Sequence, residues 1–158
     1  MSNGQGAASP RIVAVAVLVL YLLLLFLLTF RPVGSDADSA VRVNLRPLAT
    51  IGPALRLGAG SFPFNVMVGN VVAFMPLGVL LPLARRGSSW AFVLCAGLVI
   101  SVAIELGQFA LSVYFGLGYR SADIDDVILN FAGTALGLTV FVLATAMVRL
   151  FRRGGSAR

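Results

Sequence analysis

A few acidic and amide residues stand inside apolar stretches of this chain, and their spacing could form a polar binding site. Glu105 interrupts the otherwise uncharged run from residue 90 to residue 113. An acid inside a lipid-spanning helix is costly unless it faces protein or water, so Glu105 is a candidate functional residue. The same helical face would carry further small and polar residues, because they recur every three or four positions: Gly97, Ser101, Gln108 and Ser112.

A second cluster lies in RSADIDDVILNFAGTALG, from Arg120 to Gly137. Charged residues come directly before an apolar run there, and Asn130 lies one turn into that run. Asn70 and Asn130 lie roughly 6–9 Å from the ends of their helices and Glu105 lies roughly 12 Å from its own, at about 1.5 Å per residue. This shared depth predicts a polar pocket, with the charged cluster above it. Gly133 and Gly137 have the spacing that lets two membrane helices approach closely.

Three kinds of chemistry fit these residues. Carboxylate oxygens could bind Mg²⁺ or Ca²⁺, which could hold a phosphate or pyrophosphate; the candidates are Glu105, Asp123, Asp125 and Asp126. Alternatively, Arg46 or Arg120 could bind a carboxylate or phosphate directly. Catalysis with Glu105 as a base is the least favoured, because the chain has no histidine and no pattern of an activated nucleophile.

Each candidate also has a purely structural interpretation. Asp125 and Asp126 could complement the positive end of the helix dipole at the start of the last helix. Glu105 could be a structural partner of an asparagine or arginine, and the asparagines could only join helix to helix. Gly133 and Gly137 are expected to serve packing rather than ligand contact.

Composition shows which elements must position these residues. The chain of 158 residues is 59% hydrophobic and 11% charged, and a soluble domain of this size could not bury so much apolar surface. We therefore predict an all-α integral membrane protein with the lipid bilayer as its solvent. Its net charge of +6 comes from twelve arginines without lysine. These lie near the predicted helix ends, so nucleic acid is not expected as a partner.

Four runs are long and apolar enough to span a bilayer: Ile12–Phe30, Asn65–Ala84, Trp90–Val113 and Val127–Val148. Residues 1–11 are expected to be a disordered tail, residues 12–150 one transmembrane domain, and residues 151–158 a basic cytoplasmic tail. The segment 31–64 is too long for a simple connector. We expect it to be a partly ordered first outer loop that either lies on the membrane surface or dips back between the helices.

Four spans place both termini on one side of the membrane. The larger group of arginines falls on that side: Arg11, Arg85, Arg86, Arg149, Arg152, Arg153 and Arg158. The others fall on the opposite side: Arg31, Arg42, Arg46, Arg56 and Arg120. Because positively charged residues are enriched in cytoplasmic segments, both termini are predicted to be cytoplasmic and the aspartates external.

Four motifs in this order resemble the VanZ-like family of bacterial membrane proteins: NLRP at Asn44–Pro47, GNVVAFMPLGVLLP at Gly69–Pro82, SVAIELGQ at Ser101–Gln108 and RSADIDDVILNFAGTALG. The resemblance covers about residues 41–137. It implies a multi-pass protein of the bacterial cell membrane and a family whose namesake is associated with resistance to the glycopeptide teicoplanin. It assigns no catalytic roles, because the family's mechanism is not established.

The residues and the resemblance together predict an outward-facing polar pocket. It would bind a lipid-linked component of the cell envelope or a lipoglycopeptide, and contribute to glycopeptide resistance. Two alternatives remain: a metal-dependent intramembrane enzyme acting on a lipid phosphate or pyrophosphate, and a structural or partner-binding membrane protein. The candidate pocket residues are Asn44, Arg46, Asn70, Glu105, Gln108, Arg120, Asp123, Asp126 and Asn130. A divalent cation is the only cofactor considered.

Overall fold

Four long helices dominate the structure, a computed structural model that describes residues 9–30, 43–115 and 122–155. All four are long and apolar enough to cross a membrane: α1 (Pro10–Thr29), α3 (Phe62–Ala84), α4 (Trp90–Phe115) and α5 (Ile124–Gly155). The remaining elements are short: α2 (Ile51–Leu57), β1 (Val43–Asn44) and β2 (Ala122–Asp123). The predicted all-α class with four membrane-spanning helices is confirmed.

The helix boundaries extend the predicted spans at several ends. α5 begins at Ile124, so Asp125 and Asp126 lie in its first turn, and it continues to Gly155, inside the expected basic tail. α1 begins at Pro10, within the stretch 1–11 that we expected to be disordered. Proline is well suited to the first turn of a helix, where its missing N–H leaves no hydrogen bond unmade. Residues 1–8 of that stretch lie outside the described residues.

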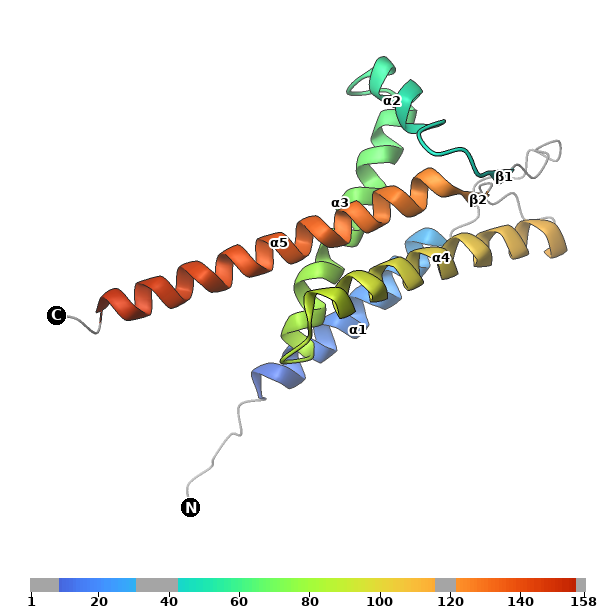
Figure 1. Cartoon of the computed structure of the whole chain (residues 1–158). Helices are drawn as coiled ribbons and strands as arrows, with labels where there is room; N and C mark the ends of the chain where they lie inside the picture. The colour runs from blue at the N-terminus through green and yellow to red at the C-terminus, as the bar shows by residue number, and fades with distance from the viewer. Residues whose placement is uncertain (1–8, 31–42, 116–121, 156–158) are drawn as a thin grey trace.

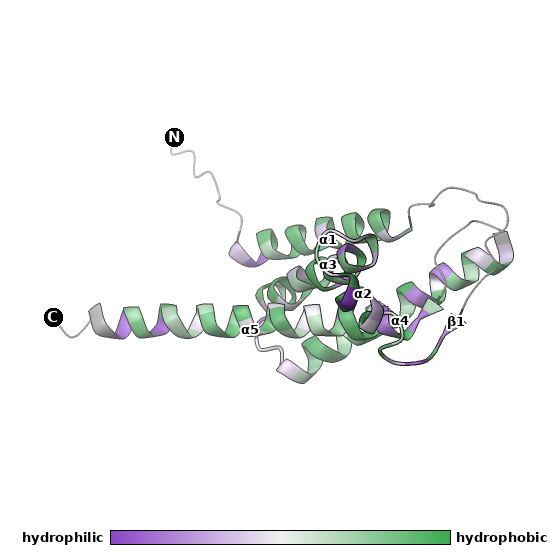
Figure 2. Ribbon diagram, turned by 90° about the horizontal axis from the view of Figure 1, so that it is seen from above, coloured by the Kyte–Doolittle hydropathy of each residue, from purple (hydrophilic) through white to green (hydrophobic). Residues whose placement is uncertain are grey.

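The long helices do not form a parallel bundle, because α3 crosses the others (Figure 1). The start of α1 and the end of α5 lie at one end of the molecule, and α2 with the two strands lies at the other (Figure 1). Figure 2 shows α1 and α5 coloured as hydrophobic along most of their length. Many large apolar side chains of both helices are exposed in the isolated chain, as expected for surfaces that face lipid.

Glycines allow α3 and α5 to touch backbone to backbone where they cross. A Cβ atom on Gly133 would collide with the carbonyl oxygen of Val71, and one on Gly137 would collide with the carbonyl oxygen of Met75. Gly78 of α3 meets the backbone of α5 in the same way. The close approach predicted from the spacing of Gly133 and Gly137 is confirmed, and α3 with α5 forms the most extensive contact among the described elements.

A small apolar core joins α1 to α3. It contains Leu25, Phe74 and Leu77. Beside it, the hydroxyl of Tyr21 donates to the carbonyl oxygen of Ala73 at 2.7 Å. Pro76 lies inside α3 and cannot donate the backbone hydrogen bond that a helix expects at its position. The carbonyl that Pro76 leaves without its helix donor is that of Val72, four residues earlier. The Tyr21 hydroxyl binds the next carbonyl along the chain and joins α1 to α3 in the turn that precedes the proline.

Contacts with two other parts of the chain order the described segment that precedes α3. β1 pairs in parallel with β2, with Asn44 opposite Asp123, and α2 packs against α3. The segment therefore connects the start of α5 to α3 at the end of the molecule opposite the termini. Residues 31–42, the first part of this loop, lie outside the described residues.

Candidate functional site

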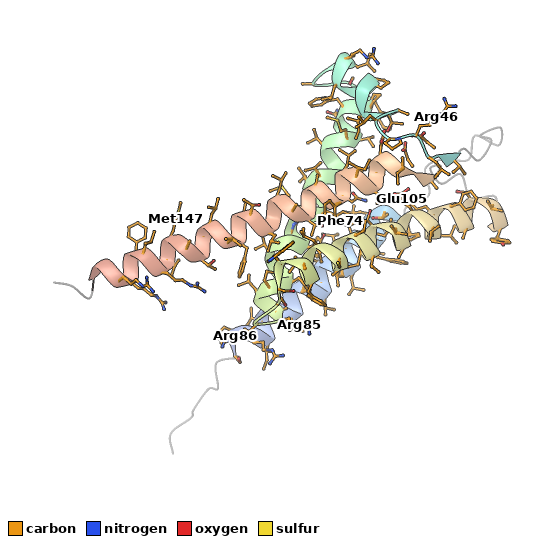
Figure 3. The ribbon with its side chains drawn as sticks, in the orientation of Figure 1. Arg46, Phe74, Arg85, Arg86, Glu105 and Met147 are labelled. Atoms are coloured by element: carbon orange, nitrogen blue, oxygen red, sulfur yellow. The ribbon has the colours of Figure 1, made fainter. Side chains whose placement is uncertain are left out.

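One face of α4 is polar and buried, as its residue spacing predicts. Ser101 is fully buried, and Glu105, Gln108 and Ser112 are 7%, 8% and 6% exposed. Gly97 continues this face and lies against the side chain of Thr134. Figure 3 shows Glu105 on the side of α4 that faces the start of α5. The face turned toward protein therefore carries the polar residues of α4, while large apolar residues of the same helix are exposed.

Glu105 and Gln108 bind different elements. The Glu105 Oε2 accepts the backbone N–H of Asp123 at 3.2 Å, which ties α4 to β2. The Gln108 Nε2 donates to the carbonyl oxygen of Thr29 at 2.9 Å, which ties α4 to the end of α1, where carbonyl groups lack partners inside the helix. Gln108, a predicted pocket residue, therefore caps a neighbouring helix.

The two asparagines make separate contacts with side chains. Asn70 donates from Nδ2 to the Oδ1 of Asp126, which joins α3 to α5. Asn130 donates from Nδ2 to the Ser101 Oγ at 3.0 Å, which joins α5 to α4. The Oδ1 of Asn130 is buried and has no hydrogen-bond partner among the described residues. These residues lie at similar depths, and their hydrogen bonds connect α3, α4 and α5.

Asp125 anchors the N-terminus of α2 from a distant part of the chain. Its carboxylate accepts the backbone N–H groups of Leu48 at 2.6 Å, Thr50 at 2.7 Å and Ile51 at 3.2 Å. It also accepts the hydroxyl of Thr50 at 2.7 Å. The first N–H groups of a helix lack partners inside it, and the Thr50 side chain does not cap α2. Asp125, which is fully buried, therefore caps α2 and not its own helix.

Asp123 provides the cap of α5. Its Oδ1 accepts the backbone N–H of Asp125 at 2.9 Å, the contact of an N-cap residue with the second residue of a helix. The same oxygen accepts the Nδ2 of Asn44 at 2.8 Å, from the strand residue opposite. The sequence interpretation placed Asp125 and Asp126 at the start of this helix, and both do lie in its first turn, but the side chain that caps α5 is that of Asp123.

Of the two candidate arginines, Arg46 lies among the described residues, and no side-chain hydrogen bond of its guanidinium is seen there. The side chain of Arg46 is exposed and extends from the segment between β1 and α2 (Figure 3). Its backbone N–H donates to the Oδ1 of Asn44 at 3.1 Å, which shapes the turn after β1. Arg120 lies outside the described residues.

A cavity of about 270 Å³ lies between α2, α3 and the first turns of α5. Its walls are mainly apolar, and two carboxylates and a hydroxyl line it as well. The lining residues are Thr50, Ile51, Ala54, Phe62, Pro63, Val66, Met67, Asp123, Asp126 and Leu129. This combination fits an amphiphile, because an apolar chain can contact the walls while a polar group meets the carboxylates.

Among the predicted pocket residues that the structure describes, Asp123 and Asp126 line this cavity. Asn44 and Asn70 hold these two aspartates in place. Glu105 reaches Asp123 only through its backbone. The described residues contain no group of three histidine, cysteine, aspartate or glutamate side chains placed to hold a metal ion. Both carboxylate oxygens of Asp125 accept hydrogen bonds from the segment between β1 and α2.

Sequence reasoning did not identify the apolar wall of this cavity. Ile51 and Ala54 come from α2, and Phe62 and Met67 come from the first turns of α3. The available signal was the stretch VNLRPLATIGPALRL, from residue 43 to residue 57, which mixes apolar residues with arginines. That stretch indicates contact with lipid or protein, but it does not say which helices it packs against.

Comparison with known proteins gives two matches. The family model described as VanZ/LLP1 matches residues 16–145. The protein named Protein VanZ from Enterococcus faecium is 30% identical to the chain over 133 residues, which are 84% of this chain and 73% of that protein. No solved structure gives a significant match.

Proposed function

We propose a function that starts from one premise: the chain belongs to the VanZ/LLP1 family. The protein binds an amphiphile of the bacterial cell envelope, either a lipid-linked envelope component or a lipoglycopeptide antibiotic, in the cavity between α2, α3 and α5. Through this binding it contributes to resistance against glycopeptides such as teicoplanin. The cavity faces the outer leaflet, because both termini are cytoplasmic in the predicted topology.

The observation that supports this function is the mixed lining of the cavity. Apolar side chains such as Val66 and Met67 stand beside the carboxylates of Asp123 and Asp126. Burying an apolar chain contributes about 25 cal/mol per Å² of apolar surface removed from water. The polar residues orient the head group and provide selectivity. A cavity of about 270 Å³ is close to the lower limit of roughly 300 Å³ for small-molecule sites, so it accommodates one part of an amphiphile.

The cavity also lies within the part of the chain that carries the family's motifs. Asp123 and Asp126 belong to the stretch Arg120–Gly137, and Asn70, which donates to Asp126, belongs to the stretch Gly69–Pro82. The motifs meet at this end of the molecule through side-chain contacts. A site there uses the residues by which the family resemblance was identified.

Antibiotic susceptibility of a sensitive host tests the proposal. The host would express the wild type, Val66→Phe, which fills the cavity, or Asp126→Asn, which removes a carboxylate charge from it. Val72→Phe is the matched control, because Val72 lies on the same helix, is 56% exposed and does not line the cavity. Membrane levels are matched by blotting. Susceptibility is measured with an acylated glycopeptide and with the same glycopeptide without its acyl chain.

We expect wild type and Val72→Phe to protect against the acylated glycopeptide, and Val66→Phe and Asp126→Asn to lose most of that protection. Lost protection against both forms of the antibiotic identifies an envelope component as the ligand. Lost protection against the acylated form alone identifies the antibiotic itself. If wild type does not protect, or if Val66→Phe protects as well as Val72→Phe, the proposed function is wrong.

A further inference from the structure

The charge of the cavity lining bears on which head group could bind there. Asp123 and Asp126 are the ionisable residues among those that line it, and both are acids. The cationic side chains described near it, Arg46 and Arg56, are exposed and are not part of the lining. An anionic head group beside Asp123 would therefore meet like charge within a partly apolar site, where an unpaired charge is expensive.

Asp123 retains an oxygen that can bind a ligand. Its Oδ1 already accepts two donors, the Asn44 side chain and the Asp125 backbone. Its Oδ2 accepts none from the residues that the structure describes, and the residue lines the cavity. Asp126 has other partners, including Asn70, so Asp123 is the carboxylate that can receive a ligand. A carboxylate oxygen at the edge of an apolar cavity favours a cationic donor, since charge-assisted hydrogen bonds are roughly twice as strong as neutral ones.

We propose that the cavity binds an amphiphile whose head carries a primary ammonium group, donated to the Oδ2 of Asp123, with its alkyl chain along Val66 and Met67. The inference rests on the proposed function and adds the sign and type of the head group. It differs from our prediction from the sequence, in which an arginine or a bound metal would hold an anionic group. The ammonium group can belong to an aminated lipid or to an acylated antibiotic that carries an amine.

Titration of simple probes into the full-length protein in phosphatidylcholine nanodiscs tests this assignment. The probes are dodecylammonium, dodecanol and dodecyl phosphate, which share one chain and differ in head-group charge. We expect dodecylammonium to bind at least tenfold more tightly than dodecyl phosphate. Asp123→Asn should reduce that preference at least tenfold. Val66→Phe should weaken binding of every probe, whereas Val72→Phe should leave binding unchanged.

Asn is the informative substitution at position 123. Its amide oxygen can keep the two hydrogen bonds that Oδ1 accepts, while its NH₂ group replaces the oxygen assigned to the ligand. Unchanged tryptic resistance at Arg56, in the neighbouring helix α2, would show that the fold around the cavity is retained.

The possible results separate the inference from the proposed function. If dodecyl phosphate binds as tightly as dodecylammonium or more tightly, and Val66→Phe abolishes this binding, the ammonium assignment is wrong. The cavity would then still be an amphiphile-binding site. Ammonium selectivity that survives in a folded Asp123→Asn variant also overturns the assignment. If Val66→Phe weakens the binding of none of the probes, both proposals are refuted. If the assignment holds, competition by an aminated lipid or by an amine-bearing acylated antibiotic identifies the natural source.

Discussion

Asp125 binds both donors of Thr50, its backbone N–H and its hydroxyl, each at 2.7 Å. The two residues are 75 positions apart in the chain, yet the contact fixes the N-terminus of α2 on the first turn of α5. α2 in turn supplies Ile51 and Ala54 to the cavity. Besides the packing of α2 against α3, this one carboxylate therefore attaches the wall of the candidate site to α5.

Asp125→Asn should release α2 while the long helices remain folded. An amide would present NH₂ to backbone N–H groups in place of one acceptor oxygen, and losing hydrogen bonds to a charged group costs about 1.5–3 kcal/mol each. Tryptic cleavage after the exposed Arg56 of α2 should accelerate at least tenfold in nanodiscs. The Arg56→Gln variant lacks this cleavage site and therefore shows which fragment arises from cleavage after Arg56. Cleavage at the wild-type rate would show that Asp125 does not hold α2.

The effect of a substitution at Leu48 should depend on how readily the new residue adopts the backbone conformation of this position, and not on the hydrophobicity of its side chain. Its φ is +67°, in the left-handed region that β-branched residues avoid. Leu48→Val should destabilise the described loop, because a branched Cβ adds to the crowding of this conformation, whereas Leu48→Gly should be tolerated because glycine adopts this conformation readily. Tryptic cleavage after Arg56 provides the measurement. Leu45→Val, at an exposed position of the same segment, is the control and should behave as wild type.

Gly133→Ala and Gly137→Ala should each disrupt the crossing of α3 and α5. The added methyl group would collide with a backbone oxygen of α3, and backbone cannot move aside as a flexible side chain can. We expect losses of about 3 kcal/mol or more, at the upper end of overpacking effects. Gly69→Ala is the matched control, because no atom lies within 4 Å of a Cβ there. Unfolding in mixed micelles would compare them, and equal stability would contradict the close crossing.

The Ser101–Asn130 contact should show measurable coupling. Ser101→Ala, Asn130→Ala and the double variant form a double-mutant cycle for this hydrogen bond of 3.0 Å. Hydrogen bonds between side chains in membrane proteins contribute about 0.6 kcal/mol on average and up to about 1.7 kcal/mol. We expect a value toward the upper limit, because both residues are buried. Additive effects would show that the contact does not contribute to stability.

The predicted topology requires α2 and the turn between α3 and α4 to lie on opposite sides of the membrane. In a Cys95→Ala background, Ala59→Cys should react with a membrane-impermeant thiol reagent in intact cells. Ser88→Cys, in the turn between α3 and α4, should react only after permeabilisation. The reverse pattern would place the cavity on the cytoplasmic side, and the outer-leaflet part of the proposed function would then be wrong.

The membrane helices and their buried polar faces could be predicted because each depends on local sequence. A long apolar run specifies a span, and the spacing of Ser101, Glu105 and Gln108 specifies one face. The partners of these residues depend on how helices far apart in the chain pack together. The sequence therefore could not show that Gln108 binds the end of α1, or that Asp125 caps α2.

The cavity was the least predictable feature, for the same physical reason. Its carboxylates were visible as charges beside an apolar run. Its apolar wall comes from the start of α3 and from α2, a helix too short to produce a clear periodic signal. The parallel pairing of Asn44 with Asp123, which brings the first loop to α5, involves strands of two residues that no pattern indicates.

The crossing of α3 with α5 has a consequence for the order in which the protein is assembled. α5 is synthesised after the other three membrane helices, yet it supplies the partners of Asn70 and Ser101 and the carboxylate that holds α2. Until α5 leaves the ribosome and inserts, α3 and α4 must wait in the bilayer with these contacts unmade. These contacts are therefore completed only with α5, and a nascent chain that stalls before Ile124 would present unpaired polar faces to the quality-control machinery of the membrane.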